Sequence, residues 1–174
     1  MKAILTEQQV ALSIKRLAHQ VIENHLQLQD TVIIGMQPRG IYVSDRIVDE
    51  LKQLVAPAKI NYGKLDITFY RDDVRKELKI ANKTDIPFSI ENKKVVIIDD
   101  VLWTGRTIRA ALDALLDFGR PSKVELCVLV DRRFSRELPI QADYVGRAID
   151  TFPQQKVIVK WKEKDGADEV VLVG

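Results

Sequence analysis

The first part of the chain has the hydrophobic spacing of an amphipathic helix. The segment T-E-Q-Q, which begins at Thr6, has the pattern of a capping box, in which a threonine and a glutamine three residues later bind each other's backbone N–H groups. Apolar residues then recur every three or four positions, at Val10, Ile14, Leu17 and Val21. Because residues at this spacing share one helix face, the pattern predicts a helix that begins at Thr6 and packs on a core.

Short apolar runs alternate with further segments of helical spacing. The runs at 31–35, 95–99 and 124–130 are rich in Val, Ile and Leu, which is typical of strands that are buried on both faces. Amphipathic helices are predicted at 41–54 and 107–118. This alternation predicts an α/β fold, with a central, mostly parallel sheet that is flanked by helices.

Three further segments complete the pattern. Residues 60–70 alternate apolar and polar side chains and predict another strand, whereas 71–88 is charged and unpatterned, which predicts a mobile loop. Near the end, 157–161 and 170–173 are apolar and are separated by Lys-Asp-Gly, a turn signal. We therefore expect a C-terminal β-hairpin.

Composition restricts the class of protein. A chain of 174 residues is long enough for one domain with a substantial core, so we expect 1–174 to fold as a single domain. The net charge is only +2, so any nucleic-acid partner must be argued from local patches. The single cysteine, Cys127, lies in a predicted buried strand and is expected to be structural. Without a membrane-length apolar run or a signal-peptide pattern, we predict a cytoplasmic protein with no membrane partner.

The most informative stretch is 95–107, V-V-I-I-D-D-V-L-W-T-G-R-T. A strand leads to Asp99 and Asp100, and a short turn then leads into a helix, so backbone N–H groups and two hydroxyls converge at the helix N-terminus. Such a point suits a phosphate. The paired carboxylates can accept hydrogen bonds from vicinal hydroxyls or hold a hydrated divalent cation. The pattern predicts a site for a ribose 5-phosphate, the alternative being an acidic turn before a capped helix.

This stretch resembles the signature of the type I phosphoribosyltransferases. The resemblance implies the fold of that family, with a small hood over the sheet. It also implies that Asp99 and Asp100 hold the ribose hydroxyls of 5-phosphoribosyl-1-diphosphate (PRPP), and that 104–107 cradle the 5-phosphate. The substrate-binding residues implied by this stretch are Asp99, Asp100, Val101, Leu102, Trp103, Thr104, Gly105, Arg106 and Thr107.

A second loop, G-M-Q-P-R-G at 35–40, also joins a strand to a helix. In open α/β sheets ligands bind at the carboxyl ends of strands, so this loop and the Asp-Asp loop can share one crevice. Alone the loop would be structural, but beside a PRPP motif it is the expected pyrophosphate loop, with Pro38 and Arg39 as binding residues. We expect Asp99, Asp100 and Arg39 to form the catalytic set.

The charged segment that follows residue 70 is the expected lid. Phosphoribosyl transfer passes through an oxocarbenium-like transition state that water would intercept, so a cover over the site has a mechanistic purpose. Arg71 is placed to meet the diphosphate when such a loop closes. The alternative is an edge strand that runs into solvent.

Motifs in the second half extend the resemblance to one subfamily. V-L-V-D-R and R-E-L-P-I-Q-A-D-Y-V-G, together with the two loops above, resemble the bifunctional pyrimidine-operon attenuators that are also uracil phosphoribosyltransferases. The resemblance implies that Arg132 and Val145 contact the base, and that uracil and PRPP form UMP and diphosphate. Mg²⁺ is expected to be held through PRPP, without direct protein ligands.

Trp103 bears on the choice of base. Purine-using relatives carry a carboxylate as the base three residues after the second aspartate, and here that position holds Trp103, which cannot take a proton. The N–H of uracil is comparatively acidic, so a dedicated base is less needed. Trp103 therefore favours a pyrimidine over a 6-oxopurine, which stays an alternative acceptor.

The subfamily resemblance also implies a regulatory partner, the leader RNA of a pyrimidine operon, bound in the presence of UMP by a homodimer or larger oligomer. The residues implied for RNA binding are Lys15, His19, Arg136 and Arg147. The sequence departs from the subfamily by one inserted residue near Phe134 and by Gln141, which replaces an arginine. Two alternatives remain, namely a solvated surface without RNA binding and an RNA-binding attenuator with little catalysis.

Overall fold

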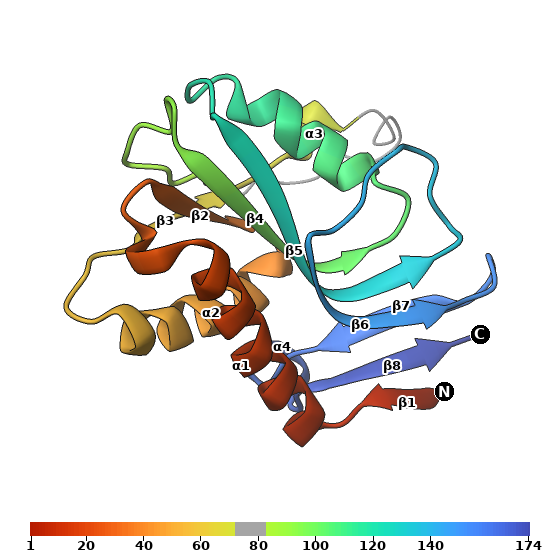
Figure 1. Cartoon of the computed structure of the whole chain (residues 1–174). Helices are drawn as coiled ribbons and strands as arrows, with labels where there is room; N and C mark the ends of the chain where they lie inside the picture. The colour runs from red at the N-terminus through yellow and green to blue at the C-terminus, as the bar shows by residue number, and fades with distance from the viewer. Residues whose placement is uncertain (72–82) are drawn as a thin grey trace.

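A parallel β-sheet lies at the centre of the computed structural model, which describes residues 1–71 and 83–174 (Figure 1). Its strands, in spatial order, are β3 (Asn61–Leu65), β2 (Thr31–Met36), β4 (Lys94–Leu102), β5 (Lys123–Arg133) and β6 (Tyr144–Asp150). Every neighbouring pair in this sheet is parallel. The predicted α/β fold with a central parallel sheet is therefore confirmed.

Helices cover both faces of this sheet. Figure 1 shows α1 (Glu7–Asn24) and α2 (Gly40–Val55) on one face and α3 (Arg106–Leu115) on the other. The predicted helices are confirmed to within a few residues at each end. Among the described residues, no helix is long and apolar enough to cross a membrane.

The start of α1 follows the predicted cap. The Thr6 side chain accepts a hydrogen bond from the Gln9 backbone N–H at 3.4 Å, and the Gln9 side chain accepts one from the Thr6 N–H at 2.9 Å. The predicted apolar face is buried, with Val10, Ile14, Leu17 and Val21 at most 4% exposed. The capping box and the helix that it begins are confirmed.

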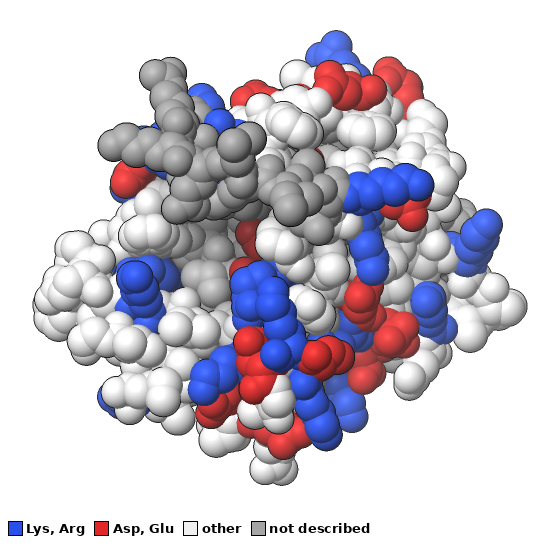
Figure 2. Space-filling view, turned by 180° about the vertical axis from the view of Figure 1, so that it is seen from behind, with Lys and Arg blue, Asp and Glu red and all other residues white. Residues whose placement is uncertain are grey.

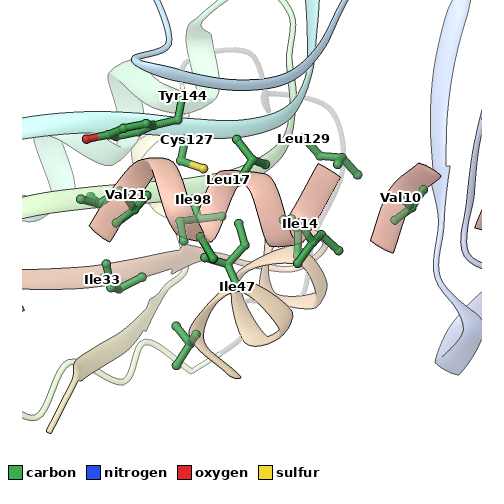
Figure 3. Packing of buried hydrophobic residues seen from close by; sticks show 14 of the residues in the cluster. Val10, Ile14, Leu17, Val21, Ile33, Ile47, Ile98, Cys127, Leu129 and Tyr144 are labelled. Carbon is green, nitrogen blue, oxygen red and sulfur yellow. The ribbon is translucent and has the colours of Figure 1, made fainter. Parts of the chain in front are cut away.

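The continuous apolar strands are explained by two cores, one on each face of the sheet. Along β4, Val96 and Ile98 pack with α1 and α2, whereas Val95 and Ile97 pack with α3. Figure 3 shows the first core, where side chains of α1 and α2 meet those of the strands. Cys127 is buried there, and burial raises the pKa of its thiol to about 12, so it stays protonated at neutral pH.

A second, smaller sheet forms a hood beside the first. The predicted C-terminal hairpin is present as β7 (Lys156–Lys160) and β8 (Glu169–Val173), which are antiparallel and are joined through the short helix α4 (Lys162–Asp165). The N-terminal strand β1 (Lys2–Leu5) pairs with the other edge of β8. Both chain ends therefore lie in this hood sheet (Figure 1).

Three predicted strand ends were wrong, and one of them is the end of β5, which was expected at Val130 and lies at Arg133. The strand expected over 60–70 ends at Leu65, because the Asp66 carboxylate accepts hydrogen bonds from the Thr68 backbone N–H at 2.9 Å and hydroxyl at 2.6 Å. This local bonding bends the chain into a 3₁₀ turn, η2 (Thr68–Tyr70). Conversely, the strand expected at 95–99 continues to Leu102, so both aspartates lie within β4.

The predicted mobile loop at 71–88 lies largely outside the described residues, which exclude 72–82. Where the description resumes, Asp85 forms an antiparallel bridge to Lys64, with both backbone hydrogen bonds at 2.8 Å. The last part of the segment is therefore attached to the edge strand β3.

A buried polar network ties the end of α1 to the sheet. His25 Nε2 lies 2.6 Å from the Glu125 carboxylate, which also accepts hydrogen bonds from Tyr144 at 2.7 Å and Lys123 at 2.6 Å. The Thr31 hydroxyl lies 3.0 Å from His25 Nδ1. The His25 ring is therefore buried as a hydrogen-bond partner of a buried carboxylate.

This network predicts a specific loss of stability in acid. Burial opposes ionisation of Glu125, but the hydrogen bonds from Lys123, Tyr144 and His25 outweigh it and lower the pKa from 4.5 to about 2. The stabilisation is complete above pH 4.5 and is lost as the pH falls toward 2. We expect Glu125→Gln to remove roughly 1–3 kcal/mol of this pH-dependent stability, measured by urea unfolding between pH 5 and pH 3.

The exposed Glu23 of α1 provides the matched control. Glu23→Gln should retain the pH dependence of the native protein. An equally steep loss of stability in acid for Glu125→Gln would contradict the assignment.

Candidate active site

A cavity of about 710 Å³ opens where the carboxyl ends of β2, β4 and β5 meet beneath the hood. Most of the residues predicted to bind substrate line it, namely Arg39, Arg71, Asp99, Asp100, Val101, Leu102, Trp103, Thr104, Gly105, Arg106, Thr107 and Arg132. Two predicted residues, Pro38 and Val145, are not among its lining residues. The fold thus brings together segments that are about a hundred positions apart in sequence.

Two buried carboxylates lie at the floor of this cavity. The Asp99 carboxylate accepts a hydrogen bond from the Asp100 backbone N–H at 2.9 Å, and the Asp100 carboxylate accepts one from the Val101 N–H at 2.8 Å. Burial and then the charge of Asp100 raise the pKa of Asp99 well above its usual range, and burial also raises the pKa of Asp100. Both carboxylates thus gain from a ligand that supplies hydroxyls or positive charge.

Gly40, the first residue of α2, allows the helix to approach the carboxylates. A Cβ atom at this position would lie 2.7 Å from Asp99 Oδ1 and 3.0 Å from its Cα. Real Cβ atoms do not approach other atoms this closely, so any larger residue would displace Asp99 or the helix. The glycine that ends G-M-Q-P-R-G is therefore required by packing against the carboxylate.

The turn after β4 has the geometry of an anion site. Gly105 has φ +93°, which glycine adopts without strain, and α3 starts at the next residue. The Arg106 backbone N–H lies 3.3 Å from the Thr104 hydroxyl and donates to it. Residues 104–107 line the cavity, so the first backbone N–H groups of α3 and the partial positive charge of this helix end lie in the cavity wall.

Arg39 connects the loop after β2 to the hood. Its guanidinium lies 3.9 Å from the Asp100 carboxylate and 3.0 Å from that of Asp165, and it donates to the Val159 backbone carbonyl. Pro38 precedes it through a cis peptide bond with Gln37. Arg39 therefore stands at the rim of the cavity, between the carboxylates and the hood.

Arg132 and Trp103 form the opposite wall. The Arg132 guanidinium lies 4.7 Å from the centre of the Trp103 ring, a cation–π contact. It also donates to the Thr151 hydroxyl at 3.1 Å and to the Gln155 carbonyl at 2.9 Å, and its burial lowers its pKa. With Trp103 still 47% exposed, the ring offers a flat apolar surface to the cavity while Arg132 lies behind it.

Val145 occupies a different environment from the expected base contact. It lies on β6, beside Val128 of β5, and its carbonyl accepts a hydrogen bond from Arg16 of α1 at 3.3 Å. The Arg16 guanidinium also reaches the Gly146 carbonyl at 2.5 Å. These bonds join α1 to the edge strand of the sheet.

The four residues predicted for RNA binding lie in different surroundings. Lys15 and Arg147 line two separate hollows of α1, of about 330 and 300 Å³, and the His19 ring nitrogen Nδ1 lies 2.8 Å from the Lys15 carbonyl. Arg136 lies elsewhere, bound to loops around the cavity. Figure 2 shows basic and acidic side chains interspersed over the face it displays.

The sequence interpretation missed five cavity residues: Ile108, Glu137, Val157, Ile158 and Val159. Three of them belong to β7, whose hairpin was predicted but not its position over the cavity. Glu137 lies in R-E-L-P-I, and its carboxylate is 2.5 Å from Arg106 Nε. That motif was the available signal for Glu137, whereas the hood residues carry no polar signature.

The donor set suits a magnesium ion that is shared with a ligand. Among residues 1–71 and 83–174, no group of three or more His, Cys, Asp or Glu side chains is arranged to hold a metal. The Asp99 and Asp100 carboxylates are nonetheless hard oxygen donors at one point of the cavity. Because Mg²⁺ is commonly bound by one or two carboxylates plus substrate phosphates, the pair fits an ion that arrives with its substrate.

A model of the phosphoribosyl transferase domain family matches residues 1–164. The chain therefore belongs to the phosphoribosyltransferases, a class of pentosyltransferases, and the resemblance recognised in its motifs is confirmed. Its curated relatives include the bifunctional protein PyrR of Enterococcus faecalis, which is 48% identical over 161 residues, or 92% of this chain and 89% of that protein. PyrR of Halalkalibacterium halodurans is 43% identical over 175 residues, covering 98% and 96% of the two chains.

Solved structures support the fold. The hypoxanthine phosphoribosyltransferase of Staphylococcus aureus has a TM-score of 0.73 at 23% identity and covers 98% of this chain and 90% of its own. That of Trypanosoma cruzi has a TM-score of 0.72 at 19% identity, with coverages of 99% and 95%. At such low identity these likenesses show the shared fold alone and do not bear on the base.

Proposed function

We propose that the protein is a uracil phosphoribosyltransferase, which converts uracil and PRPP to UMP and diphosphate. The proposal rests on three features that meet in one cavity. They are the pair of carboxylates, a helix N-terminus that is suited to a phosphate, and Trp103. Two of the relatives described above are named bifunctional PyrR, which agrees with more than one activity. The fold limits the chemistry to the carboxyl edge of the sheet.

PRPP fits this cavity in one orientation. The 5-phosphate would bind the N–H groups and hydroxyls of 104–107, and the ribose hydroxyls would donate to the Asp99 and Asp100 carboxylates. The diphosphate would then extend toward Arg39 and Arg71, which line the same cavity. Mg²⁺ held mainly through PRPP would neutralise charge on the leaving group.

The reaction needs positioning and charge stabilisation more than proton chemistry. The bond from the anomeric carbon to the diphosphate oxygen breaks, the bond to the uracil nitrogen forms, and the nitrogen loses its proton. Arg39, near Asp100, is placed to stabilise the charge that develops on the departing diphosphate. The apolar β7 residues Val157, Ile158 and Val159 lie over the site and would exclude water from the oxocarbenium-like transition state.

Trp103 supports a pyrimidine as the base. Its ring is held by Arg132 at 4.7 Å and occupies the position where a purine-specific carboxylate would stand. A planar base can stack on this ring. In this arrangement Arg132, which lines the same cavity, would also donate to a carbonyl of uracil.

Replacing both aspartates by asparagine tests whether this cavity is the active site. We expect Asp99→Asn with Asp100→Asn to reduce UMP formation by at least 10³-fold, because amides hold hydroxyls and Mg²⁺ more weakly than carboxylates. The same variant should melt at a higher temperature at neutral pH. Carboxyls with a raised folded pKa lose stability as the pH rises through that pKa, and amides do not.

Radioactive uracil conversion and calorimetry measure the two effects. The exposed Asp113 of α3 provides the control, and Asp113→Asn should leave both unchanged. Near-native turnover in the double variant would show that the reaction takes place without this pair.

The choice of base is tested by comparing acceptors. With PRPP and Mg²⁺ fixed, we expect kcat/KM for uracil to exceed that for hypoxanthine or guanine by at least 100-fold, because Trp103 supplies no carboxylate for a purine. Preferred use of a purine would assign the protein to the alternative 6-oxopurine class. Failure of all three bases, with PRPP still bound in calorimetry, would favour an attenuator with little catalysis.

We propose a second function, UMP-dependent binding of pyrimidine leader RNA by a cytoplasmic homodimer or larger oligomer. The specific support is the word bifunctional in the names of relatives that are 43–48% identical. The exposed Lys15, His19 and Arg147 are the candidate contacts, since phosphate contacts dominate such affinity. A gel shift should appear at low salt only with UMP and weaken at least tenfold in a Lys15→Gln, Arg147→Gln variant. An equal shift without UMP would exclude nucleotide sensing.

A further inference from the structure

The segment 136–140, which connects β5 to β6, lies directly against the phosphate loop. The backbone N–H groups of Glu137 and Leu138 both donate to the Thr104 carbonyl, at 3.0 and 3.2 Å. Ile140 packs on Gly105 so closely that a Cβ atom there would lie 3.0 Å from Ile140 Cγ1. The shape of the phosphate loop therefore depends on this segment as well as on its own sequence.

Arg136 is the residue that fixes the segment in place. Its guanidinium donates to the backbone carbonyls of Trp103 at 2.6 Å, Ile140 at 2.9 Å and Arg132 at 3.0 Å, and it pairs with the Asp131 carboxylate. These bonds use four of the five N–H donors of an arginine. Because its side chain is only 23% exposed, Arg136 has little capacity left for a partner in solvent.

Two of these three carbonyls belong to residues that line the cavity, whereas Ile140 packs on Gly105 of the phosphate loop. The Trp103 carbonyl lies in the loop that continues into the phosphate site, and the Arg132 carbonyl lies at the end of β5, behind the aromatic wall. One planar guanidinium thus joins the loop after β4 to the strand end of β5. No single hydrogen bond between the two loops could set both positions, since both groups are acceptors.

We propose that Arg136 is a positioning residue for phosphoribosyl transfer, which sets the position of the Trp103 loop, and of the phosphate site that follows it, relative to the end of β5. This inference rests on the function proposed above. It assigns Arg136 to the catalytic geometry in place of the RNA contact expected from its motif. In the nucleotide the 5-phosphate and the base are joined through one ribose, so a shift of either loop changes the distance that the ligand must span.

Three variants test this role. Arg136→Gln removes the guanidinium that bridges the carbonyls, and Arg136→Lys keeps a charge for Asp131 but lacks the planar fork. Arg133→Gln is the matched control, because Arg133 is three residues away on β5, half-exposed, and pairs with Asp150 at 2.8 Å on the surface. Steady-state kinetics should be measured against PRPP and against uracil separately.

We expect Arg136→Gln to lower kcat/KM by roughly 10–100-fold, since misplacement by about 1 Å has effects of this size. The KM values for PRPP and for uracil should rise together, because the Arg136 guanidinium binds segments on both sides of the cavity. Arg136→Lys should be intermediate, and Arg133→Gln should match the native protein. A residue that stabilised only the fold would lower the melting temperature without this joint rise in KM.

Trp103 provides a second readout that needs no turnover. In Arg136→Gln and Arg136→Lys its fluorescence should be quenched more strongly by acrylamide, while the fully buried Trp161 gives a constant background. Ribose 5-phosphate, as the probe ligand, should reduce this quenching in the native protein. Should the Gln variant not fold, the Lys variant decides with both readouts.

The outcomes separate the two proposals. Native protein that binds ribose 5-phosphate but forms no UMP would overturn the proposed function. The quenching result would then decide whether Arg136 positions the Trp103 loop. Unchanged KM values and unchanged quenching in both Arg136 variants would overturn the positioning role of Arg136. Native kinetics combined with a lost UMP-dependent gel shift would return Arg136 to the RNA-binding surface.

Discussion

The burial of two adjacent carboxylates at the end of β4 is the constraint on which the site depends. Removing such charges from water is unfavourable, so burial raises the pKa of both Asp99 and Asp100, and the charge of Asp100 raises the pKa of Asp99 further. The surroundings relieve part of this penalty through backbone N–H groups, Arg39 and the nearby N-terminus of α3. The remainder is a reason for the site to favour a ligand with hydroxyls and cations.

The fold was largely predictable because the sheet is built from local signals. Each central strand is a short apolar run, and each helix carries a single apolar face, so periodicity identified both. The strand β1 was missed because four residues carry no periodic signal and its partner, β8, lies more than 160 positions away. The early end of β3 was missed because the Asp66 side chain overrides an alternating pattern that continues past it.

The candidate site divides in the same way. The carboxylates, the phosphate loop and Arg39 lie on strand–turn–helix junctions, where local sequence specifies the geometry, and they line the cavity as expected. The hood residues of β7 and the segment 136–140 reach the cavity only through long-range packing. The β7 residues Val157, Ile158 and Val159 are of the types found in any core, so no motif could have identified them, whereas R-E-L-P-I was a visible motif whose place against the phosphate loop was not.

Arginine orientation shows where sequence-based interpretation of function reaches its limit. Arg16, Arg39, Arg132 and Arg136 all donate to backbone carbonyls of segments that are remote in sequence or across a loop. An arginine in the sequence specifies a positive charge, but the tertiary structure decides whether its guanidinium binds a ligand or donates to a backbone carbonyl that has no other partner. A count of basic residues therefore overstates the surface that is offered to RNA. By contrast, Lys15 and Arg147 are exposed and line two hollows beside α1, so the charges of these two residues are offered to the surface.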